Sequence, residues 1–249
     1  MKTKLKTAIL LTLLIGANLF AQTFTADSKD SRNQAQFISD APFEKINGLV
    51  SGLDAIVMLN PNDITQKPLG KVKVVISNIK TGIELRDEHL RSEMWLNAAK
   101  YPYAEFQLTG IKNPSSRSLN DGQKIKCIFV GKFSVHGVTR DIEVPGTLTY
   151  FKESEKTKAK MPGNLLVTDA EFNIKLSDYG IKIPDMVVGK VNDEVKVAAN
   201  FVASDKNASG SNPCGTCGPN KTNAQCNPCG VKKNMKKDNP CNPCAPKKK

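Results

Sequence analysis

The stretch from Cys127 to Leu148, CIFVGKFSVHGVTRDIEVPGTL, contains the clearest strand pattern of the chain. In its first half Cys127, Phe129, Phe133 and Val135 alternate with more polar residues, and the alternation resumes after residue 141. A period of two is the pattern of a strand with one buried face. The four residues 136–139, His-Gly-Val-Thr, leave room only for a tight reversal. The stretch therefore predicts an antiparallel hairpin.

Similar alternation continues on both sides of this hairpin. It is found at 34–39, 46–59, 71–77, 104–109, 171–177 and 194–201, with Gly48 and Gly52 as bend points in the second of these. About eight such strands predict an all-β fold, an antiparallel sandwich or barrel, formed by residues 22–203. Eight antiparallel strands make a barrel that either holds one ligand or is filled by its own side chains. The spacing leaves both alternatives open.

One segment, residues 83–106, departs from the strand pattern. Leu90, Met94 and Ala98 recur there at helical spacing, Asp87 suits a cap, and Pro102 suits a stop. The segment predicts a short helical insert, which is either a packing helix or a lid over the mouth of a barrel. The spacing favours the packing helix, because an apolar stripe usually faces a core.

The N-terminus predicts export. Residues 1–6 carry three Lys, and an apolar run from Ala8 to Phe20 precedes the small Ala21, although Leu19 is larger than the cleavage rule prefers. We assign residues 1–21 to a secretory signal peptide. We expect the mature protein to be secreted across the inner membrane, with the periplasm as its destination. The apolar run is too short for a comfortable membrane span.

The positive charge of the chain is concentrated at its two ends. Of the net charge of +12, residues 1–21 carry +3 and residues 204–249 carry +7, which leaves +2 for residues 22–203. A nearly neutral domain without a basic face does not predict nucleic-acid binding. The Cys/Lys/Pro-rich tail, residues 204–249, has almost no large apolar residue, so we expect it to be disordered unless cross-linked or metal-bound. Its Lys runs suit weak contact with an anionic membrane surface.

Six of the seven cysteines lie in this tail, in three CxxC pairs: Cys214 and Cys217, Cys226 and Cys229, and Cys241 and Cys244. This spacing lets two thiolates reach one metal ion, and thiolates favour Zn²⁺ or Cu(I). In an oxidising compartment the same thiols form disulfides, and both alternatives stay open. A redox role ranks last, because it needs a fold around the thiols. Cys127, alone on an alternating strand, is expected to be a small buried apolar residue.

Three motifs of the domain resemble those of the YceI family. They are RDEHLRS at 86–92 with AAKYP at 98–102 and Phe106, GKFSVHGVT at 131–139, and DYGI at 178–181 with Pro184. The resemblance covers about residues 22–203 and does not extend to the tail. It implies an exported, closed, eight-stranded antiparallel barrel, similar to lipocalins in shape, with an apolar cavity for a polyisoprenoid or quinone-like lipid. One departure is Met94-Trp95, where the family commonly has Phe, beside the expected cavity mouth.

The resemblance favours a barrel with a cavity over a filled one. Candidate ligand-binding residues are then Trp95 and the apolar strand faces: Phe106, Leu108, Phe129, Phe133, Val135, Leu148, Phe172 and Ile174. Each buried CH₂ gives about 0.8 kcal/mol, so a five-carbon unit gives roughly 3–4 kcal/mol. Association costs on the order of 4–15 kcal/mol. We therefore expect long isoprenoid chains to bind and short ones to bind poorly, with no cofactor required.

No catalytic residue is predicted. His89 lies among charged residues, His136 lies at a turn, and no Ser or Cys can be placed beside either. Solvated or locally hydrogen-bonded imidazoles fit these positions better than catalytic ones. The expected function is lipid binding rather than catalysis. The alternative is a lipid-modifying enzyme or a thiol redox protein that acts through the CxxC tail.

Overall fold

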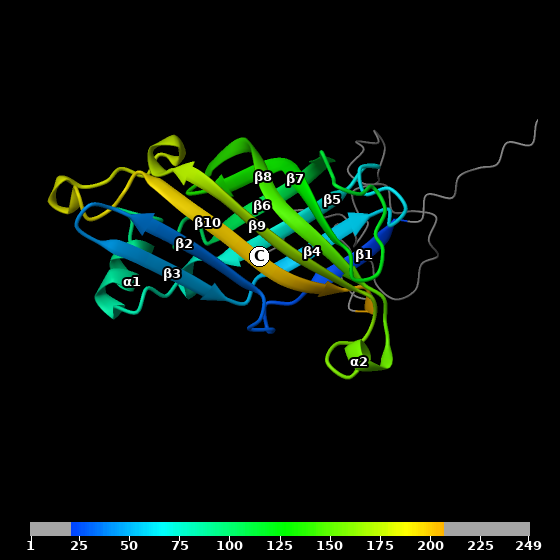
Figure 1. The fold of residues 1–249 in the computed structure, drawn as a ribbon. Helices are drawn as coiled ribbons and strands as arrows, with labels where there is room; N and C mark the ends of the chain where they lie inside the picture. The colour runs from blue at the N-terminus through cyan, green and yellow to red at the C-terminus, as the bar shows by residue number, and fades with distance from the viewer. Residues whose placement is uncertain (1–20, 207–249) are drawn as a thin grey trace, which may run out of the picture.

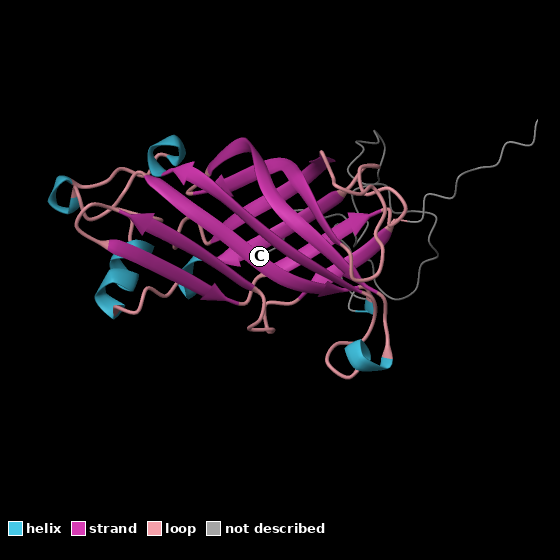
Figure 2. Ribbon diagram, in the orientation of Figure 1, coloured by secondary structure: helices cyan, strands magenta, loops and turns pink. Residues whose placement is uncertain are grey.

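The computed structural model describes residues 21–206, which form a closed antiparallel barrel (Figure 1). Its strands are β1 (Gln22–Ala26), β2 (Gln34–Asp40), β3 (Lys45–Ser51), β4 (Asp54–Leu59), β5 (Leu69–Val75), β6 (Tyr103–Lys112), β7 (Lys124–Val135), β8 (Val138–Phe151), β9 (Leu165–Lys175) and β10 (Glu194–Ser204). The short helices are η1 (Ile76–Asn78), α1 (Glu84–Arg91), α2 (Glu155–Lys158), η2 (Leu176–Tyr179) and η3 (Asp185–Val187). Strands dominate the fold (Figure 2), which confirms the all-β class.

Eight strands close the barrel. From β4 to β10 each strand is antiparallel to the next, and β1 pairs with both β4 and β10. At the seam, Thr25 of β1 is the register partner of Ser204 of β10. The predicted hairpin is β7–β8, which turns at His136 and Gly137 with φ angles of 53° and 76°. Positive φ at both positions is what a two-residue hairpin turn with the strand twist requires.

The β2–β3 hairpin extends the barrel on one side. β2 pairs with the first part of β10, ahead of the seam, and β3 pairs with β2. The stretch 46–59, predicted as one long strand with bend points, is two strands that are separated at Gly52. The φ of Gly52 is 86°, and a Cβ there would overlap the carbonyl of Ser28. The bend at Gly52 is thus confirmed, whereas Gly48 stays inside β3.

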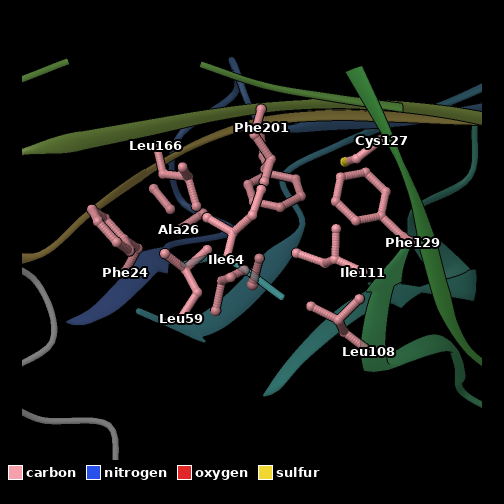
Figure 3. Packing of buried hydrophobic residues seen from close by; sticks show 14 of the residues in the cluster. Phe24, Ala26, Leu59, Ile64, Leu108, Ile111, Cys127, Phe129, Leu166 and Phe201 are labelled. Carbon is pink, nitrogen blue, oxygen red and sulfur yellow. The ribbon is translucent and has the colours of Figure 1, made fainter. Parts of the chain in front are cut away.

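One end of the barrel is tightly packed. Ile64, from the loop between β4 and β5, is fully buried there with Phe24, Leu59 and Leu166 (Figure 3). The loop is held in place because the amide of Ile64 donates a hydrogen bond of 2.8 Å to the carbonyl of Arg117. These side chains close this end of the barrel.

The helical insert is shorter than the sequence predicted. α1 ends at Arg91, and turns follow as far as Lys100, so the predicted stop at Pro102 is wrong. Met94 is 62% exposed and lies outside α1, so the expected stripe through Leu90 and Ala98 does not form. None of the helices within residues 21–206 has the length and apolar character needed to cross a membrane.

The predicted helix cap is also wrong. Ile83 occupies the cap position of α1 without a side-chain hydrogen bond, and Asp87 lies one turn later. The carboxylate of Asp87 instead accepts hydrogen bonds from the backbone amide and the hydroxyl of Thr81, at 2.7 and 2.6 Å. Asp87 therefore fixes the segment before α1 rather than the first turn of the helix itself.

Candidate binding cavity

An apolar cavity of about 660 Å³ lies inside the end of the barrel that carries α1 (Figure 1, left). Its wall combines inward-facing residues of β2, β3, β5, β6, β7, β9 and β10 with residues of α1 and the loops beside it, and Val, Ile, Leu, Phe and Ala supply most of it. Ile83 and Leu85 line the cavity and are 52% and 62% exposed. The cavity therefore opens to solvent beside α1.

The insert covers a gap that the strands leave beside β3. β2 pairs with one edge of β3. At the other edge, β3 forms just one isolated bridge within the described part of the chain, between Leu49 and Lys80. Ile76, Ile79 and Leu90 pack against Val50 of β3 and fill this space. The two roles considered for the insert are therefore combined, because the same segment packs on the core and borders the mouth of the cavity.

Polar side chains on the cavity wall gather near this mouth. Six of the seven polar residues on the wall come from α1 and the segment before it, from the end of β2 and the turn after it, and from the loop before β10: Ser39, Glu44, Thr81, Arg86, His89 and Lys190. The seventh, Gln36, lies in the middle of β2 opposite Ala198 and is exposed. Arg86 makes three side-chain hydrogen bonds here. Its Nη1 donates to the carboxylate of Glu44 at 2.6 Å. Its Nε donates to the hydroxyl of Thr81 at 2.9 Å, and its Nη2 donates to the carbonyl of Thr81 at 3.0 Å. Arg86 thus ties α1 to the β2–β3 turn across the rim.

Asp87 is a buried carboxylate directly behind this rim. Burial alone would raise the pKa of Asp87. The side-chain and backbone hydrogen bonds from Thr81 lower the pKa, as do the positive charges of Lys80 and Arg91, each 3.9 Å from the carboxylate. Together these interactions outweigh burial and hold the pKa below its usual value. Asp87 therefore stays ionised and anchors the start of the insert. It is not among the residues that line the cavity.

A second, much smaller chamber of about 70 Å³ lies deeper in the barrel. The two spaces share four wall residues, Val72, Phe106, Phe172 and Ala199. Phe106 and Phe172 are the two large side chains among these four. These two residues therefore supply most of the side-chain volume of the wall that the cavity and the chamber share, which we call the partition.

All nine residues predicted to bind ligand line one of the two spaces. Six of them line the large cavity: Trp95, Phe106, Phe133, Val135, Phe172 and Ile174. The other three, Leu108, Phe129 and Leu148, line only the small chamber. The strand register explains this division, because Phe129 lies four residues deeper along β7 than Phe133 and on the same inward face.

The β2–β3 hairpin supplies a part of the wall that was not predicted from the sequence. Phe37, Ile46 and Val50 point into the cavity from it. One signal was available, since Phe37 faces Gly48 across the strand pair, and a Cβ on Gly48 would overlap the Phe37 ring. An aromatic residue opposite a glycine inside a sheet indicates a ring that lies flat on the neighbouring strand.

The three motifs that the sequence singled out meet at the same end of the barrel. His136 Nδ1 lies 3.1 Å from the carbonyl of Tyr179, and the Tyr101 ring packs edge-on against His136 with centroids 5.0 Å apart. Arg140 donates two hydrogen bonds, of 3.1 and 2.9 Å, to the carbonyl of Asp178. His136 is therefore locally hydrogen-bonded, as predicted, and the motifs build the wall around the cavity.

The cysteines divide between the barrel and the tail. Cys127 is buried, and burial raises the pKa of its thiol to about 11, which confirms its expected role as a small buried residue. Within residues 21–206, no cluster of three or more His, Cys, Asp or Glu has the geometry to hold a metal ion. The six predicted metal or disulfide positions, Cys214 to Cys244, lie outside the described residues, as do the predicted signal-peptide residues 1–20.

Comparisons with known proteins agree with this architecture. A UPF0312 protein of Yersinia pestis is 27% identical over 197 residues, which cover 74% of this chain and 92% of the relative. Two solved structures share the fold, each with a TM-score of 0.56. BcnA of Burkholderia cenocepacia is 18% identical, and the match covers 72% of this chain and 100% of BcnA. A polyisoprenoid binding domain of Saccharophagus degradans is 12% identical, and the match covers 74% of this chain and 98% of that domain. A sequence profile of the YceI-like domain matches residues 24–203. The chain therefore belongs to the YceI-like domain family.

Proposed function

We propose that the barrel binds a long apolar lipid, of the polyisoprenoid or quinone-like kind, in the large cavity. The observation that carries this proposal is the cavity itself, about 660 Å³ of space with a largely apolar wall and one open end. Its volume lies within the range of about 300–1,000 Å³ that is usual for ligand pockets. The solved neighbour from Saccharophagus degradans, described as a polyisoprenoid binding domain, supports the same class of ligand.

The chemistry of the wall restricts the ligand. Below the rim the wall offers almost no hydrogen-bond partners, and burying an unpaired polar group costs free energy. Sugars, nucleotides and peptides are therefore poor candidates, whereas a hydrocarbon chain gains about 0.8 kcal/mol for each CH₂ it buries. The cavity would then select among lipids by their shape and by the length of their hydrocarbon chain.

The same distribution of polar groups orients the ligand. Thr81, Arg86 and His89 lie at the rim, and Phe106 and Phe172 lie at the bottom of the cavity. A lipid with one polar end would place that end at the rim, where hydrogen-bond donors and acceptors are present. Its chain would then run down to the aromatic partition.

We also propose that the protein works in the periplasm after removal of residues 1–21, and that its Lys-rich tail makes weak contact with an anionic membrane surface. Support comes from the sequence, in the charged and apolar N-terminal run and in the Lys runs of the tail. Fractionation of cells that express the chain with and without residues 1–21 tests export, since only the full chain should reach the periplasm.

Ligand binding is tested with two variants of neighbouring alanines on β10. Ala199 lines the cavity and Ala198 points to the other face of the strand. Native mass spectrometry of the protein purified from the exported fraction should show a bound lipid on the wild type and on Ala198→Phe. Ala199→Phe fills the cavity and should lower uptake of a long-chain quinone at least about tenfold, because several buried CH₂ groups are lost. A wild-type barrel that is always empty and takes up no long-chain quinone would contradict the proposal.

A further inference from the structure

We propose that Phe106 and Phe172 set the maximum chain length of the bound lipid, and that the small chamber beneath them stays free of ligand. This inference rests on the proposed function, because it names the feature of the lipid that the cavity measures. The barrel contains two separate spaces, which meet at a wall that both share.

The direction of the ligand makes this wall the stop for its chain. Apart from the exposed Gln36 of β2, the polar lining residues lie near the mouth, so the apolar end of a bound lipid points toward Phe106 and Phe172. The chamber beyond them is closed on its far side by Ile111, Phe129, Leu148 and Phe201 (Figure 3 shows Ile111, Phe129 and Phe201). A chain that passed the partition would have only about 70 Å³ to enter.

Both rings of the partition are held in position. The ring of Phe172 packs edge-on against Phe133 with centroids 5.3 Å apart, and Phe133 packs in the same way against Tyr179 at 5.7 Å. The ring of Phe106 lies against Gly131 of the neighbouring strand, where an added Cβ would come within 2.7 Å of the ring. The absence of a side chain at Gly131 therefore makes room for the Phe106 ring, and the aromatic contacts oppose movement of Phe172.

The chamber also contains a polar group that a hydrocarbon would not satisfy. The hydroxyl of Thr168 faces buried space, and it has no hydrogen-bond partner within residues 21–206. The end of a lipid chain beside the Thr168 hydroxyl would leave this hydroxyl without a hydrogen-bond partner. Burying an unpaired hydroxyl costs free energy. The chamber is thus less favourable for an isoprenoid terminus than the cavity above it.

The test compares positions 106 and 108, which lie on the same face of β6. Leu108 lines only the small chamber, so Leu108→Ala enlarges the chamber and leaves the partition in place. Phe106→Ala opens the partition. Trp95, the single Trp of the chain, lines the cavity and reports binding by its fluorescence. The probes are all-trans polyprenols that differ by one isoprene unit.

We expect wild-type affinity to rise with chain length up to a limit and then to stop rising. Phe106→Ala should move this limit by about one isoprene unit and bind the longer polyprenol about tenfold more tightly or better, whereas Leu108→Ala should keep the wild-type limit. Circular dichroism checks the fold of each variant. Phe172→Leu tests the second ring of the partition, and Phe106→Leu replaces Phe106→Ala if that variant does not fold.

Two results would overturn the inference. If Leu108→Ala moves the limit as far as Phe106→Ala, the wild-type ligand already enters the chamber. If no variant of Phe106 or Phe172 moves the limit, the partition does not set chain length. Failure of every polyprenol and of long-chain quinones to bind the wild type would instead reject the proposed function, so the two failures are distinguishable.

Discussion

Arg86 and Glu44 form an ion pair at the mouth of the cavity, with Arg86 Nη1 2.6 Å from a carboxylate oxygen of Glu44. Arg86 belongs to α1, and Glu44 lies in the turn between β2 and β3. The pair therefore joins the helical insert to the hairpin that extends the barrel. Both side chains are partly exposed, at 24% and 39%, so the pair contributes at most about 1 kcal/mol to stability. Its position indicates an effect on ligand access instead.

Breaking this pair should speed the exchange of ligand. We expect Glu44→Gln to raise the rate of lipid release several-fold and to change the free energy of unfolding by no more than about 1 kcal/mol. Stopped-flow measurement of Trp95 fluorescence during displacement of a bound quinone gives the rate. Glu143→Gln is the matched control, because it removes the exposed ion pair of Lys112 and Glu143 at 2.7 Å on the outside of the barrel. Equal release rates for the two variants would show that the rim pair does not restrict access.

Asp87 should contribute more to stability than the rim pair does. Its buried carboxylate accepts two hydrogen bonds from Thr81. Hydrogen bonds to a charged group contribute about 1.5–3 kcal/mol, and we expect Asp87→Asn to lower the free energy of unfolding by about that amount at neutral pH. Asp141→Asn is the control, since the Asp141 side chain is 82% exposed. Urea unfolding of the three proteins measures the difference, and equal losses in both variants would contradict it.

The effect of Asp87 should also depend on pH. Its pKa in the folded protein lies below the ordinary value of 3.8, so the folded state favours the ionised form. The stabilisation is fully present above the unfolded-state pKa and is lost as the pH falls from about 3.8 toward the lower folded-state pKa. The difference in unfolding free energy between the wild type and Asp87→Asn should therefore be constant near neutral pH and shrink below about pH 4. If this difference in unfolding free energy grew as the pH falls, the pKa of Asp87 would be raised on folding rather than lowered.

The strands could be predicted because their pattern is local. Cys127, Phe129 and Phe133 alternate with residues that face solvent, and a strand with one buried face has to show such a period. The inward direction of the eight candidate residues on strands followed from the same period, whereas Trp95 lies in the helical insert. The division of the candidates between a cavity and a chamber did not follow from it, because this division depends on how the strand register sets each residue's depth and on how the Phe106 ring packs on Gly131 of another strand.

The length of α1 could not be predicted from its own periodicity. Leu90, Met94 and Ala98 have helical spacing, but the wall of the cavity uses Leu90, Trp95 and Leu96. To bring these residues inward, the chain leaves the helix after Arg91 and turns, with a positive φ of 46° at Asn97. Contacts with the rest of the barrel thus override a pattern that is locally consistent with a longer helix.

Cys127 should be unreactive in the folded barrel. Its thiol is buried with a pKa of about 11, so at neutral pH almost none of it is the reactive thiolate. In a variant that lacks residues 207–249, Cys127 is the single thiol. We expect Ellman's reagent to label this variant no faster than the barrel unfolds, and to label it completely in urea. Rapid labelling without denaturant would mean that the thiol reaches solvent through the cavity or the seam.

The boundary between barrel and tail decides where a truncation should be placed. The carboxylate of Asp205 accepts hydrogen bonds from the Gln22 amide at 2.7 Å and from the backbone and side chain of Asn164 at 2.9 and 2.7 Å. Ser204 is fully buried at the seam. The contacts of the barrel thus extend as far as Asp205, and a deletion should begin at residue 207. An insulin-reduction assay of the full and the truncated chain then separates lipid binding from thiol redox activity, which would be lost with the tail.

Removing residues 207–249 should leave the barrel intact and abolish tight binding of soft metal ions. The seam from Thr25 to Ser204 and the contacts of Asp205 all lie within the part that remains. We therefore expect the melting temperature to change by no more than about 2–4 °C, which corresponds to about 1 kcal/mol in a domain of this size. Cys127 alone cannot supply the several thiolates that a Zn²⁺ or Cu(I) site needs, so titration of the reduced proteins should show tight binding by the full chain only.

A large fall in melting temperature would mean that the tail packs on the barrel. Equal metal affinity of both proteins would exclude a metal site at Cys214–Cys244 and leave disulfides as the simplest explanation for these six residues.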